Sequence, residues 1–266
     1  MFQQFFGFSE IPFAPVMYRE NIFPSEAMLE LLKRFDYILQ HGGFMLLTGD
    51  PGTGKSSALR CLIASLNKQT YFPVYLPLST VGAVDFYKQL NTALSGPHAF
   101  FKADLFRAIQ GQISSLVSTR NLVPVLCFDE AHLLHDLIFK ELQLLSNFHV
   151  DSASPAVFIL AGQSILQDRL RAHHLASFFQ RLSLKFHLNA LSPQETKAYI
   201  LHHLKLAGFE GQEILSEPAY EAVFNLSKGI PRVIGALTTK AFLACAMLKK
   251  RKITEEDILS VSQEVL

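Results

Sequence analysis

The chain reads Gly49-Asp50-Pro51-Gly52-Thr53-Gly54-Lys55-Ser56 between an apolar run, residues 44–48, and the segment that begins at Ser57. This is the phosphate-loop pattern GxxxxGK[ST], placed between a predicted buried strand and a predicted helix. Glycines let the backbone turn tightly, so that its N–H groups and the N-terminus of the next helix approach phosphate oxygens. Lys55 is then expected to contact the β and γ phosphates, and the Ser56 hydroxyl to ligate Mg²⁺. A purely structural turn is the alternative, but it leaves the lysine and hydroxyl in register unexplained. We therefore expect residues 49–57 to bind ATP or GTP.

Composition is typical of a cytoplasmic α/β protein with a smaller helical part. The 266 residues are 49% hydrophobic, which is enough for a sizeable core, and the net charge is +1, so any DNA contact must come from a local patch. Cys61, Cys127 and Cys245 are odd in number and lie in apolar surroundings, which favours reduced thiols over disulfides or zinc. No apolar run reaches the roughly 18 residues of a membrane helix, and no signal peptide is recognisable. We expect a cytoplasmic location and no membrane partner.

Two acidic residues follow a second buried run. Residues 123–128 are apolar, as in a parallel strand covered on both faces, and they lead into Asp129 and Glu130. With the phosphate loop upstream, Asp129 is expected to join the Mg²⁺ shell and Glu130 to orient the attacking water. The alternative is that the two acids only open the next helix, since acids suit a helix N-terminus.

A third buried run, residues 156–162, ends at Gln163. Ligands of doubly wound sheets lie beyond the carboxyl ends of the strands, so this amide is a candidate to contact the γ-phosphate or its attacking water. Capping of the next helix is an equally good interpretation of Gln163.

Periodicity and turn residues divide the chain into three parts: 1–40, an aromatic segment and helix packed on the ATPase core; 41–190, the nucleotide-binding α/β domain; and 191–266, a helical lid. The lid is predicted to begin at Ser192, where Ser-Pro-Gln-Glu forms a capping box. The predicted strands are residues 44–48, 71–78, 123–128, 156–162 and 184–188. The predicted helices are residues 26–40, 55–66, 81–94, 103–119, 195–207, 217–227, 231–248 and 254–265.

Three basic features lie outside the motifs. Arg232 follows Pro231 at a predicted helix start, where the dipole disfavours a cation, and this placement is explained if Arg232 faces phosphate. The run Lys249–Lys252 either complements the preceding helix C-terminus or touches nucleic acid. Lys102 and Arg107 near the turn at residues 95–98 mark either a solvated face or a DNA contact.

Taken in this order, the phosphate loop, the acid pair, the polar strand end and Gly229-Ile230-Pro231-Arg232 resemble an AAA+ ATPase. Three further segments resemble its ExeA-like branch, which is similar to the TniB, TnsC and IstB-type regulators of DNA transposition: Phe5-Phe6-Gly7-Phe8 with Pro12-Phe13, Gly43–Gly49, and Ala161-Gly162-Gln163. Glutamine at position 163 departs from the asparagine, serine or threonine usual in the wider superfamily.

The resemblance implies a parallel sheet in which the sensor strand flanks the phosphate-loop strand, and ATP held between subunits. It also implies an arginine finger donated by a neighbouring subunit, and Arg181 matches that position, with Arg169 and Arg171 as fallbacks. Arg232 matches the lid sensor.

Three functions are consistent with the resemblance. The first is a transposition regulator that assembles on double-stranded DNA with ATP, as a ring or helical filament, recruits a transposase and disassembles on hydrolysis. The second is an ExeA-like ATPase that serves secretion or envelope machinery without DNA. The third is a nucleotide-operated switch in which turnover is incidental.

Overall fold

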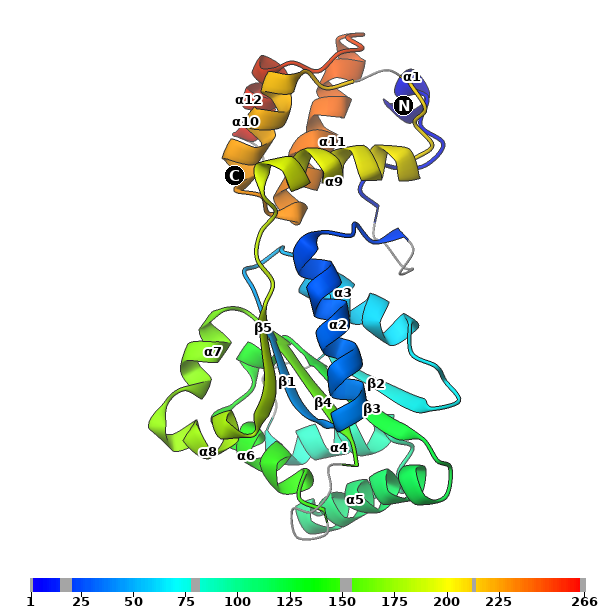
Figure 1. The fold of residues 1–266 in the computed structure, drawn as a ribbon, viewed down its shortest axis with the longest axis vertical. Coiled ribbons are helices and arrows are strands. Elements are labelled where there is room, and N and C mark those ends of the chain that lie inside the picture. Colours follow the sequence, from blue (N-terminus) through cyan, green and yellow to red (C-terminus); the bar gives the residue numbers. More distant parts are fainter. Residues whose placement is uncertain (1, 15–20, 78–81, 149–154, 212–213, 264–266) are drawn as a thin grey trace. The chain divides into compact units, whose positions relative to one another are not determined.

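The structure of the protein is a computed structural model that describes residues 2–14, 21–77, 82–148, 155–211 and 214–263 (Figure 1). The strands, in chain order, are β1 (Gly43–Thr48), β2 (Tyr71–Pro77), β3 (Val123–Asp129), β4 (Val157–Gly162) and β5 (Leu182–His187). The helices up to β5 are α1 (Phe2–Phe6), α2 (Glu26–His41), α3 (Lys55–Ala64), α4 (Ala83–Ala93), α5 (Lys102–Ser118), η2 (Ala131–Leu133), α6 (Asp136–Leu145), α7 (Ile165–Leu170), η3 (His173–Leu175) and α8 (Ala176–Gln180). The helices after β5 are α9 (Pro193–Leu206), α10 (Glu217–Ser227), α11 (Pro231–Met247) and α12 (Glu255–Ser262).

The described strands form one parallel sheet in the order β2-β3-β4-β1-β5. Side chains of β1, β3 and β4 are buried on both faces, which is why these strands read as continuous apolar runs in the sequence. The phosphate-loop strand β1 pairs with β4 on one side and with β5 on the other. The expected sensor strand is β4, which precedes Gln163, and it therefore flanks β1 as expected. The predicted α/β fold class with a parallel sheet is confirmed.

Contacts divide the chain into two units, and the first contains the sheet with residues 29–50 and 58–188. One face of the sheet forms a continuous hydrophobic cluster with α4, α5 and α6, to which alternate strand residues such as Phe44, Leu126 and Phe158 contribute. Helix α2 crosses the opposite face (Figure 1). The carboxyl ends of the parallel strands therefore share one edge, and each strand passes from there into a loop or helix.

The second unit consists of residues 2–14, 21–28, 51–57 and the described residues from 189 onwards. Helix α9 begins with the predicted capping box, in which Ser192 Oγ accepts from the Glu195 N–H across 3.2 Å and a Glu195 carboxylate oxygen accepts from the Ser192 N–H across 2.9 Å. From that point every described regular element is helical, as predicted, apart from a single bridge between Leu215 and Ile253.

The N-terminal segment lies elsewhere than expected. The sequence predicts that residues 1–40 pack on the ATPase core, but the rings of Phe2, Phe6 and Phe8 contact Phe242 of α11 and belong to the helical unit. Of the segment 1–40, only the part of α2 from Leu29 onwards belongs to the sheet unit. An aromatic-rich stretch indicates burial but does not determine which of two apolar surfaces covers it. Here the aromatic rings pack against α11.

Candidate functional site

The phosphate loop connects β1 to α3, as predicted. Gly52 and Gly54 have φ angles of +86° and +104°, in the left-handed region that favours glycine, so the loop backbone needs these two residues. Lys55 is the first residue of α3, and both Lys55 and Thr53 are buried. A lysine that is 7% exposed at a helix N-terminus is unfavourable by itself, because burial and the helix dipole both disfavour a cation. An anion bound by the loop would offset both effects.

Asp129 is the last residue of β3 and is 4% exposed. Its Oδ1 accepts a hydrogen bond from the Glu130 N–H across 2.9 Å, and its Oδ2 accepts one from the Tyr75 hydroxyl across 2.7 Å. Burial and this hydrogen bond raise the pKa of Tyr75 well above its usual range, so Tyr75 is a protonated donor at neutral pH. The Asp129 carboxylate is therefore held by two donors.

Glu130 differs from Asp129 in its exposure and its backbone. It has φ +54°, a left-handed conformation that is uncommon for a residue with a side chain, and its side chain is 48% exposed. Its Oε2 lies 3.3 Å from Nδ1 of His132, and this nitrogen has no hydrogen-bond partner in the part of the chain that the structure describes. The turn thus directs one acid into the sheet and leaves the next accessible to water.

Strand β4 brings Gln163 and Ser164 to the same edge. Thr48 pairs with Gly162, and the Ser164 hydroxyl donates to Oδ1 of Asp50, in the phosphate loop, across 2.7 Å. A Cβ atom at Gly162 would lie 3.1 Å from the backbone nitrogen of His132, so β4 and the turn after Asp129 approach closely. Gln163 follows β4 directly, at the edge where β1 enters the phosphate loop and where Asp129 ends β3.

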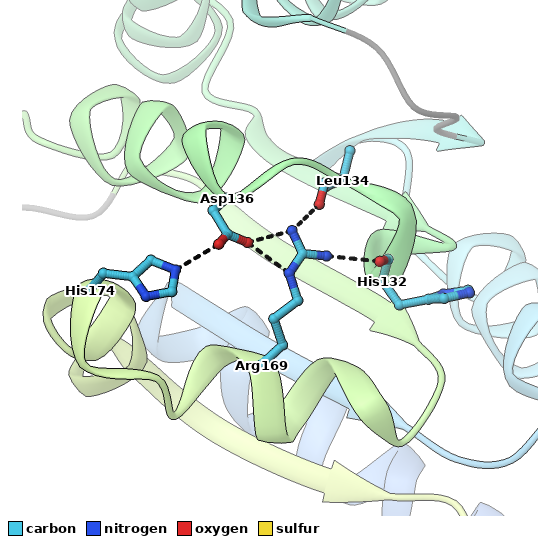
Figure 2. Close-up of polar contacts among 5 residues, drawn as sticks. All are labelled: His132, Leu134, Asp136, Arg169 and His174. Carbon is cyan, nitrogen blue, oxygen red and sulfur yellow. Dashed lines mark hydrogen bonds and ion pairs between the residues drawn. The ribbon is translucent and has the colours of Figure 1, made fainter.

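Arg169 of α7 binds the segment that follows Glu130 (Figure 2). Its guanidinium donates to the carbonyl oxygen of His132 across 2.9 Å, to that of Leu134, and to Asp136 Oδ1 across 2.7 Å. His174 contacts the other oxygen of Asp136 across 2.6 Å. Burial would raise the pKa of Asp136, but the hydrogen bonds from His174 and Arg169 outweigh it and lower that pKa. Arg169 therefore ties α7 to the turn that carries Glu130.

The other two candidate finger arginines have different surroundings. Arg181 lies between α8 and β5, and its guanidinium donates to Oδ1 of Asn147 across 2.7 Å. Arg171 pairs with Asp168 across 3.4 Å, and its side chain is 56% exposed. Arg169 makes several hydrogen bonds within its own unit.

Pro231 and Arg232 begin α11 in the helical unit, to which residues 51–57 also belong. The Arg232 N–H donates to the carbonyl oxygen of Gly52 across 3.3 Å, and a Cβ at Gly52 would lie 2.9 Å from Ile230 Cγ2 and 3.0 Å from Arg232 Cβ. The Arg232 side chain is exposed. The phosphate loop and the start of α11 are thus in backbone contact.

Sequence reasoning missed Tyr75, Ser164 and the anchoring role of Arg169. Tyr75 and Asp129 are 54 residues apart, and only the pairing of β2 with β3 brings them together. Alternation along β2 was visible in the sequence, but the order of the strands was not.

The donors present fit a magnesium nucleotide better than a transition metal. The candidate magnesium ligands, the Ser56 hydroxyl and the Asp129 carboxylate, are both hard oxygen donors of the kind that Mg²⁺ prefers. Among the described residues no group of three or more His, Cys, Asp or Glu side chains could hold a metal ion. In the same residues, no helix has both the length and the apolar character needed to cross a membrane.

Comparisons with known proteins bear on the family and the fold of the chain. The chain is 33% identical over 269 residues to "General secretion pathway protein A" of Aeromonas hydrophila, an alignment that covers all of this chain and 48% of the relative. It thus spans about half the length of the curated relative that it matches. The fold is similar to that of Cdc6p from Pyrobaculum aerophilum, with a TM-score of 0.71, 17% identity and coverage of 99% and 71% of the two chains. A chain of Drosophila ORC bound to DNA matches with a TM-score of 0.65, 17% identity and coverage of 93% and 65%. Residues 38–170 match the AAA domain family AAA_22, and the chain therefore belongs to that family.

Proposed function

We propose that the chain hydrolyses ATP in a Mg²⁺-dependent reaction. Lys55 and the backbone of residues 49–57 bind the phosphates, and Ser56 and Asp129 hold the metal. Bound Mg²⁺ would neutralise charge on the β and γ phosphates. Glu130 orients a water molecule and accepts its proton, while the water oxygen bonds to the γ-phosphorus and the bond to the bridging oxygen breaks.

The observation that carries this proposal is the contrast between Asp129 and Glu130 at the strand edge where β1 enters the phosphate loop. The Asp129 side chain is buried and held by two hydrogen-bond donors, which is typical of a metal ligand. The Glu130 side chain is 48% exposed, so it is accessible to the water molecule that it would orient and deprotonate. Two acids that only opened a helix would both face solvent, and neither would need a hydroxyl partner.

Four further residues complete the proposed site. The Gln163 amide donates to the γ-phosphate or positions the water, and Pro231 with Arg232 contacts the nucleotide from the start of α11. Arg181 acts in a second copy of the chain as an arginine finger, so that turnover requires a homo-oligomer, either a ring or a helical filament.

Glu130→Gln tests the catalytic assignment. The amide keeps the shape of the side chain but cannot accept a proton, so we expect turnover to fall by about 10²–10⁴-fold while ATP binding is unchanged. Phosphate release and the Kd for ATP are measured together. The matched control is Glu221→Gln, at an exposed position of α10, which should change neither quantity. Unchanged turnover in Glu130→Gln would exclude Glu130 as the base.

We propose that this ATPase serves secretion or envelope machinery. The support is the identity to "General secretion pathway protein A", which extends along the whole of this chain. Since the relative is about twice as long, the partners of this chain, like its cytoplasmic location, stay predictions.

A transposition regulator on double-stranded DNA is the second candidate. Its support is the similarity of the ExeA-like branch, which the phenylalanine-rich start resembles, to the TniB, TnsC and IstB-type regulators. The exposed side chains of Lys249, Arg251 and Lys252 add a basic surface. In this candidate, assembly on DNA recruits a transposase and hydrolysis releases it.

Duplex binding separates the two candidates. A DNA-assembled regulator should bind duplex DNA with a non-hydrolysable ATP analogue and not with ADP, and binding should weaken steeply with salt as counterions are released. Absence of binding at 50 mM salt with the analogue excludes the transposition function and leaves the secretion function. The third function, a nucleotide-operated switch, predicts that the protein binds ATP but shows negligible turnover even when DNA and a protein partner are present.

A further inference from the structure

Tyr75 and Asp129 lie on the same face of the sheet because of the pairing between β2 and β3. Tyr75 is in register with Cys127 and Pro77 with Asp129, so positions 75, 127 and 129 alternate onto one face. The hydroxyl of Tyr75 consequently reaches Oδ2 of Asp129 across 2.7 Å.

We propose that Tyr75 is a positioning residue that orients the Asp129 carboxylate toward Mg²⁺. This inference rests on the proposed ATPase function. Asp129 has one identified donor on each oxygen, the Glu130 N–H and the Tyr75 hydroxyl, which together fix the plane of the carboxylate. A carboxylate oxygen has two lone-pair sites, so each oxygen keeps one for the metal or for a water of its shell. Without the hydroxyl, Oδ2 loses its donor and the carboxylate is free to turn.

Tyr75 does not serve mainly as a core residue. Its neighbours Val74 and Leu76 are buried in the hydrophobic cluster of the sheet, whereas Tyr75 is 39% exposed on the opposite face. Loss of its hydroxyl therefore removes little packing, and its main consequence falls on Asp129. Outer partners of this kind tune metal affinity because they fix the orientation of the ligand.

The chain contains a matched control. The hydroxyl of Tyr87, on α4, donates to Oε2 of Glu141, on α6, across 2.6 Å, so the same pair of groups occurs among the core helices. Tyr87 and Glu141 are both buried. Tyr87→Phe removes an equivalent tyrosine–carboxylate bond without touching Asp129.

The experiment compares Tyr75→Phe, Tyr87→Phe and the wild type in nucleotide binding and turnover. A fluorescent non-hydrolysable ATP analogue is titrated in EDTA, and Mg²⁺ is then titrated at a fixed analogue concentration. For Tyr75→Phe we expect an unchanged metal-free Kd and a Mg²⁺ half-saturation raised by about 10-fold. Turnover of this variant should fall at low Mg²⁺ and recover at high Mg²⁺. For Tyr87→Phe we expect a lower melting temperature and a wild-type Mg²⁺ half-saturation.

Each other outcome has a definite meaning. If Tyr75→Phe and the wild type have the same Mg²⁺ half-saturation, the Tyr75 inference is wrong while the proposed ATPase function stands. If Tyr75→Phe fails to fold, the inference is also wrong, because it assigns the hydroxyl no major role in stability. If wild-type binding of the analogue does not depend on Mg²⁺, the proposed function itself fails.

Discussion

Arg169 and Asp136 form an ion pair that joins α7 to the first turn of α6, with Nε donating to Oδ1 across 2.7 Å. The same guanidinium donates to the carbonyl oxygens of His132 and Leu134 (Figure 2). One arginine thus holds the segment that follows Glu130.

Arg169→Ala is therefore expected to act within its own subunit. Loss of charge-assisted hydrogen bonds to partly buried groups should lower the free energy of unfolding by roughly 2 kcal/mol. Urea denaturation measures this change. Arg171→Ala is the control, since its exposed pair with Asp168 should contribute under about 1 kcal/mol. Equal stability of the two variants would contradict an anchoring role for Arg169.

Arg181→Ala is expected to act between subunits. An arginine finger contributes about 10³–10⁵-fold to turnover, so hydrolysis by the assembled protein should collapse while the Kd for ATP is unchanged. Mixing the two variant proteins gives the sharper measurement. Arg181→Ala lacks the finger and Glu130→Gln lacks the base, so each variant alone should be inactive. Mixed assemblies contain some sites at which one subunit supplies Glu130 and its neighbour supplies Arg181, and these assemblies should regain activity. If mixing restores nothing, Arg181 acts in its own subunit or not at all.

Gly52→Ala tests the contact between the phosphate loop and α11. Alanine is strained at φ +86°, and its Cβ would lie 2.9 Å from Ile230 Cγ2 and 3.0 Å from Arg232 Cβ. We expect a loss of more than about 1 kcal/mol in unfolding free energy, together with weaker ATP binding. Gly82→Ala is the control, because Gly82 has φ −72° and none of the described residues beyond its chain neighbours places an atom within 4 Å of the added Cβ. Wild-type ATP affinity in Gly52→Ala would refute the need for glycine there.

His203 should make the helical unit sensitive to acid. Burial, with a smaller effect of His202, lowers the pKa of His203 to about 4, and its ring contacts those of Phe13 and Tyr199. The unfolded chain binds this proton from about pH 6.5 downward, whereas the folded chain stays neutral, so stability is full above pH 6.5 and is lost as the pH falls towards 4. The loss amounts to roughly 3 kcal/mol.

Urea denaturation between pH 4.5 and 7.5 measures this slope. His203→Phe keeps an aromatic ring and removes the titration, so its curve should be flatter than that of the wild type over this range. Parallel curves for the two proteins would show that other groups cause the acid sensitivity.

Local patterns were sufficient for the strands and for most of the helices. The predicted strand after the phosphate loop, residues 71–78, agrees with β2 at Tyr71–Pro77, and the predicted helix 217–227 coincides with α10. These features depend on neighbours in the sequence, because propensity, alternation and capping act over a few residues. The roles of Lys55, Glu130 and Arg181 follow from the motifs and stay predictions.

The sequence by itself determined that a glycine-rich turn joins a buried strand to a helix and that two acids end a second buried strand. Only the tertiary structure decided that Tyr75 contacts Asp129, that Arg169 holds the turn after Glu130, and that the N-terminal phenylalanines pack on α11. The physical reason is the separation along the sequence over which each effect acts. Backbone preferences and apolar periodicity are local, whereas strand order and the choice among apolar surfaces depend on the free energy of the whole packed chain.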